Sequence, residues 1–311
     1  MNPTFTQEAD FRKEREFGQK ISAAFEFIRA HWRPLGRVLL YTVLPTALLY
    51  GLLTSFLQIN LLGRRVAVFN GDRVGVSTQW RVAAEMMSSP LYWLNMALGA
   101  LFFSLVILSV YGYVLGCLRG PAGGPVTVAE VWAIIRRQLL STTLSILGIY
   151  LLIAVGFIFL FIPGIYLSVM LSLFFIVKMV EGTGFADTVS RCWHLIKGKW
   201  WSTFGLLFVM TLLLYAVLFA VGLVTAALAG GMAALVSGAS SPLFVVVTSV
   251  LTTGLMLFFY PPLLLVLAFQ YFNLVERRDG TGLRSLVGQL GQPAPAAPRN
   301  ASLRADEEGE Y

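Results

Sequence analysis

Long apolar stretches separated by short polar segments dominate the pattern of this chain. Most of them reach about 20 residues, the length at which an α-helix crosses the hydrocarbon core of a bilayer. They predict six spanning helices, at about Leu35–Leu57, Leu91–Leu118, Leu140–Phe161, Gly164–Val180, Trp200–Leu228 and Pro242–Leu274. The sequence therefore predicts an all-α, multi-pass membrane protein whose transmembrane domain occupies residues 17–287.

The segments around these stretches predict where the spans bend and how they are joined. Pro45 should kink the first span and Pro261-Pro262 should bend or break the last one, because proline removes a helix hydrogen bond and crowds the preceding turn. Only Ile162-Pro163-Gly164 separates the third and fourth spans, so these two must form a tight helical hairpin. The longest polar connection is 58–90, on the extracytoplasmic side, where alternation around Asn70-Gly71 predicts a β-hairpin.

Three amphipathic segments, at 17–33, 127–139 and 184–199, each precede a pair of spans and are typical of helices that lie in the membrane interface. They can be superposed without gaps, and each then shows an apolar residue, an aromatic residue, a second apolar residue and a cation in the same order. The matched positions are Ile21, Val128 and Val189, then Phe25, Trp132 and Trp193, then Ile28, Ile135 and Ile196, then Arg29, Arg136 and Lys197, while Trp32 and Trp200 match with Leu139 between them. The pattern predicts three units of interfacial helix plus transmembrane hairpin, at about 17–118, 127–180 and 184–274.

An even number of spans in each unit gives all three units the same orientation, so the repeats should be parallel and related by an axis near the membrane normal. Each interfacial helix would bury its apolar stripe against lipid tails or the hairpins and hold its cation among the headgroups. The alternative is that no duplication occurred, since aromatic residues and cations are enriched at any membrane interface.

The distribution of basic residues predicts the orientation. Cytoplasmic loops carry an excess of lysine and arginine, and here the cations gather before the first span, in the loops that hold the second and third amphipathic segments, and after the last span. The connections at 162–164 and 229–241 contain none, and only the 58–90 loop dissents, with four arginines. We therefore expect a protein of the cell membrane with both termini in the cytoplasm.

Composition supports the membrane class and limits the partners. Charged residues make up 13% of the 311 residues and the mean hydropathy is +0.75, whereas soluble domains are about 25% charged. The net charge of +7 lies mostly beside the ends of apolar stretches. Anionic lipid headgroups at the cytoplasmic face are therefore the expected partners rather than nucleic acid, with a membrane-protein partner or a second copy as a further option.

The tails and the cysteines complete the picture. The polar stretch at 1–16 predicts a flexible tail, and the stretch at 288–311, poor in large apolar residues, predicts a disordered one. Cys117 and Cys192 fall near cytoplasmic helix ends and are expected to be free thiols. With two histidines in the chain and no Cys-x-x-Cys spacing, neither a metal site nor a cofactor is expected.

Several short motifs occur together between about Phe161 and Gly205. They are Pro163-Gly164, Glu181-Gly182, Ser190-Arg191-Cys192-Trp193 and Lys197-Gly198-Lys199-Trp200-Trp201. This segment resembles the membrane domain associated with some bacterial glycerophosphoryl diester phosphodiesterases, and related stand-alone integral membrane proteins of unknown function. The resemblance implies a membrane domain and not diesterase activity, because the chain has no charged α/β segment to form the soluble catalytic barrel that some relatives carry.

Ionisable side chains are absent from the cores of the predicted spans, where a charge costs about 2.5–3.5 kcal/mol. This argues against a protease, a proton-coupled transporter or a metalloenzyme. Glu181 and Lys178, spaced i, i+3 at a helix end, could act as a functional pair, although an ordinary interfacial ion pair is the simpler interpretation. Gln270 and Asn273 could line a substrate path or form hydrogen bonds between helices, and His194 is interpreted as a surface histidine.

We expect a non-catalytic scaffold, assembly or regulatory protein that acts through its helix surfaces and interfacial residues. The candidate residues are Phe25, Arg29, Trp32, Trp132, Arg136, Pro163, Gly164, Glu181, Arg191, Trp193, Lys197 and Trp200. The alternative is a small transporter or lipid-handling protein, and a third hypothesis, intramembrane lipid hydrolysis, lacks paired carboxylates and histidines. Transport requires the polar span residues to converge on one cavity: Ser104, Ser109, Thr142, Ser168, Ser172, Thr248, Thr252 and Gln270.

Overall fold

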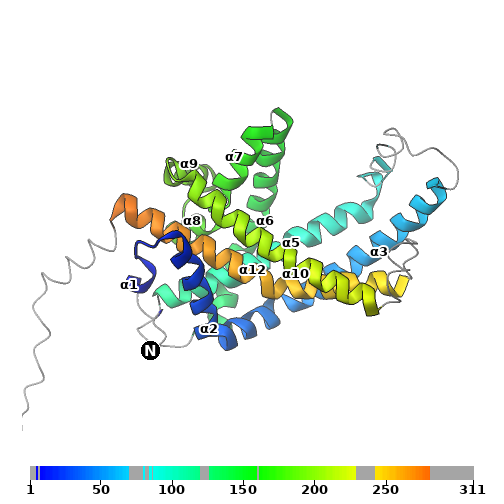
Figure 1. Cartoon of the computed structure of the whole chain (residues 1–311), viewed down its shortest axis with the longest axis horizontal. Coiled ribbons are helices and arrows are strands. Elements are labelled where there is room, and N and C mark those ends of the chain that lie inside the picture. The colour runs from blue at the N-terminus through cyan, green and yellow to red at the C-terminus, as the bar shows by residue number, and fades with distance from the viewer. Residues whose placement is uncertain are drawn as a thin grey trace, which may run out of the picture.

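The computed structural model describes Phe5 and residues 8–69, 80, 84–85, 87–119, 126–159, 161–228 and 242–280. All regular structure in these residues is helical (Figure 1). The helices are α1 (Glu8–Phe11), α2 (Phe17–Thr42), α3 (Leu44–Phe69), α5 (Pro90–Arg119), α6 (Val128–Phe159), α7 (Phe161–Leu171), α8 (Phe174–Glu181), α9 (Phe185–Ile196), α10 (Trp200–Leu228) and α12 (Pro242–Asp279). The predicted all-α class is confirmed for this part of the chain.

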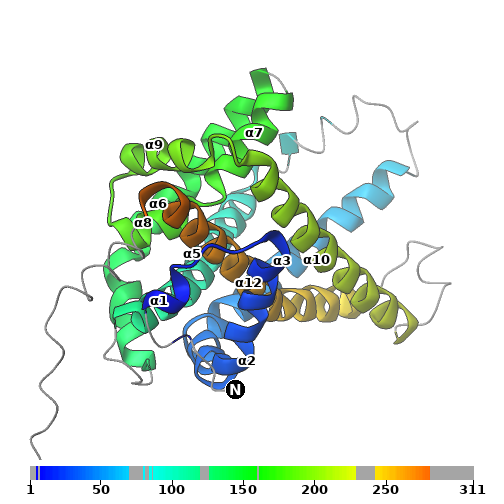
Figure 2. The same cartoon turned by 60° about the vertical axis from the view of Figure 1, so that its left-hand side comes forward.

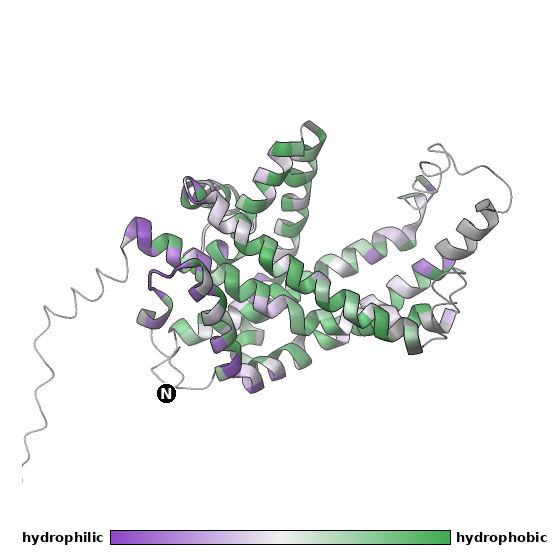
Figure 3. Cartoon of the chain, in the orientation of Figure 1, coloured by the Kyte–Doolittle hydropathy of each residue, from purple (hydrophilic) through white to green (hydrophobic). Residues whose placement is uncertain are grey.

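Five helical stretches of the described chain are long and apolar enough to cross a membrane. They are Pro90–Arg119, Val128–Ile158, Phe161–Glu181, Trp200–Val224 and Val245–Asp279. The number rises to six if α2 and α3, bent by 54° relative to each other, count as one broken span. Figure 3 shows apolar residues along these helices and hydrophilic residues around α1, the start of α2 and the end of α12.

Helix α2 continues past the point where the sequence places its end. The predicted interfacial helix 17–33 is the first part of a helix that runs to Thr42, with a kink at His31, whose φ of −116° and ψ of 16° are not helical. Pro34 explains the kink, because a proline inside a helix donates no N–H and crowds the turn before it. The predicted boundary between interfacial helix and span is therefore a kink in one helix.

Helix α3 begins after Val43, and the 54° bend between α2 and α3 falls there. The kink predicted at Pro45 is thus present as a break two residues earlier. Because α3 runs to Phe69, residues 65–69 are helical and the first arm of the predicted β-hairpin is wrong. Its turn at Asn70-Gly71 lies outside the described residues, as does the tail predicted to be disordered at 288–311.

Helix α6 runs without a break from Val128 to Phe159, so the predicted interfacial helix 127–139 is not a separate element. No glycine or proline occurs between Val128 and Leu147, and without such a stop signal the helix continues into the span.

Helices α6 and α7 form a tight hairpin, with α6 ending at Phe159 and α7 beginning at Phe161. Ile162-Pro163-Gly164 belongs to the first turns of α7 rather than to the connection, a place where proline is tolerated. A Cβ on Gly156 would lie 3.2 Å from the Gly164 Cα, so the two helices touch through their glycines.

Helix α12 is continuous through Pro261-Pro262, so a break in the last span is wrong, while a bend there stays a prediction. Proline is tolerated in an apolar helix when neighbouring groups take over the freed backbone carbonyls.

The long helices do not all run the same way. Helix α12 packs against α3, α2, α10 and α5, whereas the α6–α7 hairpin points in another direction, with its tip well separated from the end of α3 in both views (Figures 1 and 2). The arrangement as three equivalent parallel units stays a prediction.

Residues 104–115 of α5 are all buried, as are residues 264–275 in the second half of α12. The described part of the segment predicted as a flexible tail packs here. Phe11 is 1% exposed and stacks on Phe269 with ring centroids 6.0 Å apart, and Phe5 lies 5.6 Å from the same ring. Burying a phenyl ring contributes about 1.5–3 kcal/mol, so these two phenylalanines anchor the segment.

Candidate functional site

The three segments predicted to be interfacial share an inner position with the same burial. This position follows the first matched apolar residue by three, and its side chain is 0% exposed in every segment: Ala24, Val131 and Cys192. The equivalence predicted from the sequence therefore extends to which helix face meets the protein core, even though the three segments end differently.

The outer positions of the three segments are also alike. The matched aromatic side chains are all exposed: Phe25 at 43%, Trp132 at 41% and Trp193 at 50%. The matched cations four residues further on are exposed as well: Arg29, Arg136 and Lys197. Residues four apart lie on the same side of a helix, and an aromatic ring beside a cation is the combination that suits the headgroup layer of a membrane.

The equivalence does not extend to Trp32 and Trp200. Trp32 is 61% exposed, and the guanidinium of Arg33 lies 5.3 Å from its ring centroid. Trp200 is half-buried, stacks on Tyr166 with centroids 5.7 Å apart, and donates from Nε1 to the Tyr166 carbonyl at 3.4 Å. Trp200 therefore joins the start of α10 to α7, whereas Trp32 faces outward.

Glu181 and Arg191 meet in a polar cluster where the ends of α8, α9 and α12 come together. The Arg191 Nε donates to both Glu181 carboxylate oxygens, at 3.0 and 3.1 Å. The same guanidinium donates to Asp279, and the Tyr271 hydroxyl donates to Glu181 at 3.0 Å. Gly182, with a left-handed φ of 69°, ends α8 and lets α9 fold back so that Arg191 reaches Glu181.

The predicted pair of Lys178 with Glu181 is wrong. The Lys178 Nζ donates to Ser141 Oγ at 2.9 Å and to Ser145 Oγ at 2.6 Å, both on α6. Lys178 thus holds α8 against α6.

Arg191 is the cation of the cluster. Burial opposes its charged form, but the hydrogen bonds and charges of Asp279 and Glu181 outweigh this effect, so the pKa of Arg191 is raised. A guanidinium held between two carboxylates is a firm cross-link between three helix ends, and Asp279 was not among the predicted residues.

Three polar residues of the apolar helices pair across different helix contacts. The pairs are Ser104 with Thr143 at 2.9 Å, Ser109 with Thr42 at 2.8 Å, and Gln270 with Thr203 at 2.9 Å. They join α5 to α6, α2 to α5, and α10 to α12, so these polar side chains do not share one cavity. The hydrogen bond between helices that was predicted for Gln270 is confirmed.

Four of the other polar span residues bond locally or face outward, and Thr142 is buried at 2% exposure. Ser168, Ser172 and Thr248 donate to carbonyls of their own helices, and Thr252 is exposed. Asn273 accepts a hydrogen bond from the Arg15 backbone N–H at 2.8 Å, so it holds the N-terminal segment instead of a neighbouring span.

The thiols and histidines make no metal site in the part of the chain that the structure describes, where no three residues of the His, Cys, Asp and Glu types come together. His194 is exposed, as predicted. Cys117 and Cys192 are free thiols, and burial raises the pKa of Cys192 to about 12.

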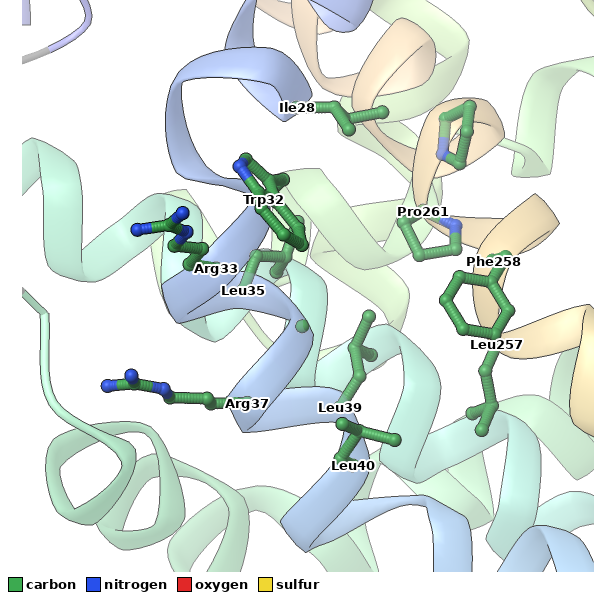
Figure 4. Close-up of a pocket in the computed structure, with 12 residues that line it drawn as sticks. Ile28, Trp32, Arg33, Leu35, Arg37, Leu39, Leu40, Leu257, Phe258 and Pro261 are labelled. Atoms are coloured by element: carbon green, nitrogen blue, oxygen red, sulfur yellow. The ribbon is translucent and has the colours of Figure 1, made fainter.

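A pocket of about 370 Å³ that the sequence did not indicate lies between α2 and α12 (Figure 4). It falls in the range of about 300–1,000 Å³ that is usual for small-molecule sites. The α12 side is formed by Leu257, Phe258, Pro261 and Pro262, and the α2 side by Ile28, Trp32, Leu35, Gly36, Leu39 and Leu40. Arg33 and Arg37 complete the lining, and their guanidinium groups point to one side of α2, away from Pro261 and Phe258 (Figure 4). The four-residue spacing of Arg29, Arg33 and Arg37 marks the basic side of α2 in the sequence but not the pocket itself.

Comparison of the chain with protein-family models, with curated proteins and with solved structures finds no match. The resemblance of the segment from Phe161 to Gly205 to a phosphodiesterase-associated membrane domain therefore stays a prediction.

Proposed function

We propose that this chain is a non-catalytic integral protein of the cell membrane that acts as a scaffold, an assembly factor or a regulator. The observation that carries the proposal is the common burial pattern of the three interfacial segments, each of which exposes an aromatic residue and a cation while burying the residue beside them. Such pairs bind anionic headgroups and leave the exposed apolar faces of α6 and α10 for lipid, a membrane-protein partner or a second copy.

The proposal includes the membrane placement and the repeat. The hydrophilic end of the molecule, with α1 and the end of α12 (Figure 3), is assigned to the cytoplasm on the excess of basic residues there. The shared burial pattern supports three related units, each an interfacial segment followed by a hairpin. We also propose that the chain has the fold of the phosphodiesterase-associated membrane domain, which the segment from Phe161 to Gly205 resembles.

A flux assay in liposomes tests the non-transporting role. Purified full-length protein should not accelerate the movement of ions, sugars or amino acids into sealed liposomes above the background of empty ones. A flux that is abolished by Ser109→Ala or Gln270→Leu, and kept in the exposed control Thr252→Ala, would overturn the proposal. Capture of a defined membrane-protein partner after cross-linking in native membranes, lost in Trp132→Ala/Trp193→Ala, would support it.

The pocket between α2 and α12 favours one second candidate, a lipid-handling protein. An apolar pocket beside a membrane surface is where such a protein would hold a chain. Transfer of fluorescent phospholipid between donor and acceptor vesicles distinguishes the two functions, because a scaffold or regulator should not speed it.

A further inference from the structure

We infer that the pocket between α2 and α12 seats one acyl chain of an anionic phospholipid whose phosphate is held by Arg33 and Arg37. The inference names a ligand class that the proposed function does not, and it rests on that proposal only in placing α2 at a membrane surface.

The apolar part of the site suits a hydrocarbon chain. Leu35, Leu39 and Leu257 are buried behind it, at 3%, 7% and 3% exposure, while Trp32 and Phe258 stand at its edge, at 61% and 67%. The pocket thus has a closed apolar floor and an open apolar rim, which a flexible chain arriving from the surrounding lipid can enter without desolvating polar groups.

The polar part of the site suits a phosphate. Arg33 and Arg37 are exposed, lie one helical turn apart, and point their guanidinium groups to the same side of α2 (Figure 4). Neither forms an ion pair with another described residue, and Arg33 only lies over the ring of Trp32. Guanidinium groups bind phosphate oxygens in bidentate fashion, and Arg29, exposed one turn earlier, extends the positive stripe toward the start of α2.

Gly36 links the two parts. At 3.6 residues per turn it lies between the arginine side of α2 and the side that carries Trp32 and Leu39. It lines the pocket, and a Cβ built on it would meet no atom within 4 Å. This open strip gives the glycerol portion of a lipid a route over α2, from the arginines to the pocket.

The position of α2 agrees with this assignment. The whole stripe precedes the 54° bend at Val43, on the part of the chain that carries the interfacial pattern of Phe25 and Arg29. A lipid phosphate lies at this level, with its chains on the apolar side.

Lipid binding to the full-length protein in detergent tests the inference. We would titrate it with palmitoyl-oleoyl phosphatidylglycerol, with the matching phosphatidylcholine and with glycerol 3-phosphate, and count bound lipid by native mass spectrometry. One phosphatidylglycerol should stay bound with a preference over phosphatidylcholine of about 10- to 30-fold, as expected for two arginines near a surface. Retention of glycerol 3-phosphate as strong as that of phosphatidylglycerol would show that a phosphate is enough for binding. This result would overturn the assignment of the pocket to an acyl chain.

Two matched sets of variants separate the parts of the site. Gly36→Leu should abolish the retained lipid, whereas Gly18→Leu, on the same helix and with equally open space around its Cβ, should keep it. Arg33→Gln/Arg37→Gln should still bind lipid but lose the anionic preference, whereas Arg136→Gln/Arg137→Gln should keep the preference. Equal binding by all four variants and the parent overturns the inference, while failure of the parent to insert into liposomes would instead overturn the proposed function.

Discussion

The Nε atom of Arg191 lies 3.0 and 3.1 Å from the two carboxylate oxygens of Glu181, ten residues away, at the junction of α8 and α9. The side chains are 26% and 22% exposed, so water screens this pair only in part. Because Arg191 also reaches Asp279 at the end of α12, the pair joins elements that are far apart in the chain. The cluster therefore holds the folded form of the bundle end together.

Glu181→Gln tests this cross-link. The change keeps the shape of the side chain and removes its charge, so Arg191 and the Tyr271 hydroxyl lose a charged acceptor. We expect a loss of about 1.5–3 kcal/mol in the free energy of unfolding, measured by reversible denaturation in mixed micelles. Glu26→Gln, at an exposed site on α2, should change it by less than about 0.5 kcal/mol, and equal effects of the two variants would contradict the prediction.

The sequence predicts the existence of the helices well and their ends less well. Trp200–Leu228 was predicted with the same bounds as α10 because Lys197-Gly198-Lys199 interrupts the apolar pattern before it. The end predicted at Leu139 failed because nothing in α6 stops the helix there. The length of an apolar stretch determines whether a helix can cross a bilayer, whereas its ends depend on capping residues that can be absent.

Of the candidate site, the sequence could predict only contacts between residues that are close together along the chain. Lys178 is one turn from Glu181 and was the natural partner by spacing. The actual partner, Arg191, becomes available only because Gly182 reverses the chain, and Asp279 arrives from another helix. The pocket beside Gly36 depends in the same way on how α2 crosses α12, which no pattern within either helix reports.

Gly164→Ala tests the close approach in the α6–α7 hairpin. A Cβ at this position would lie 2.6 Å from Cγ and Cδ1 of the Phe157 ring, so the ring or the helix must move. We expect a loss of about 1–3 kcal/mol of stability from overpacking. Gly254→Ala in α12, where a Cβ meets nothing within 4 Å, should instead gain about 0.5–1 kcal/mol; a gain in both variants would show that the hairpin is not tight.

Thr203 and Gln270 test how a buried polar contact stabilises the α10–α12 interface. Both side chains are 0% exposed, the Gln270 Nε2 donates to Thr203, and the Gln270 Oε1 has no partner among the described residues. Thr203→Val leaves the amide unpaired and should cost about 1–3 kcal/mol, whereas Thr203→Val/Gln270→Leu should recover most of that loss, since removing both partners can be nearly neutral. Thermal denaturation of the three proteins in one detergent measures the difference, and a double variant no more stable than Thr203→Val would show that the contact is not the cause.

Cys192 should be an unreactive thiol in the folded protein. It is 0% exposed in α9, and burial, followed by the charge of Glu181, raises its pKa from an ordinary value of 9.0 to about 12. In a Cys117→Ser background, maleimide at pH 8 should therefore label Cys192 only after denaturation, and Cys192→Ala should abolish that labelling.

The raised pKa of Cys192 also predicts how stability depends on pH. Because the folded state keeps the thiol proton that the unfolded state releases between about pH 9 and 12, the free energy of unfolding falls as pH rises through that window, and the group contributes nothing below it. Cys192→Ala should accordingly show a shallower loss of stability with pH across the window, and rapid labelling of the native protein at pH 8 would contradict the buried position of this helix face.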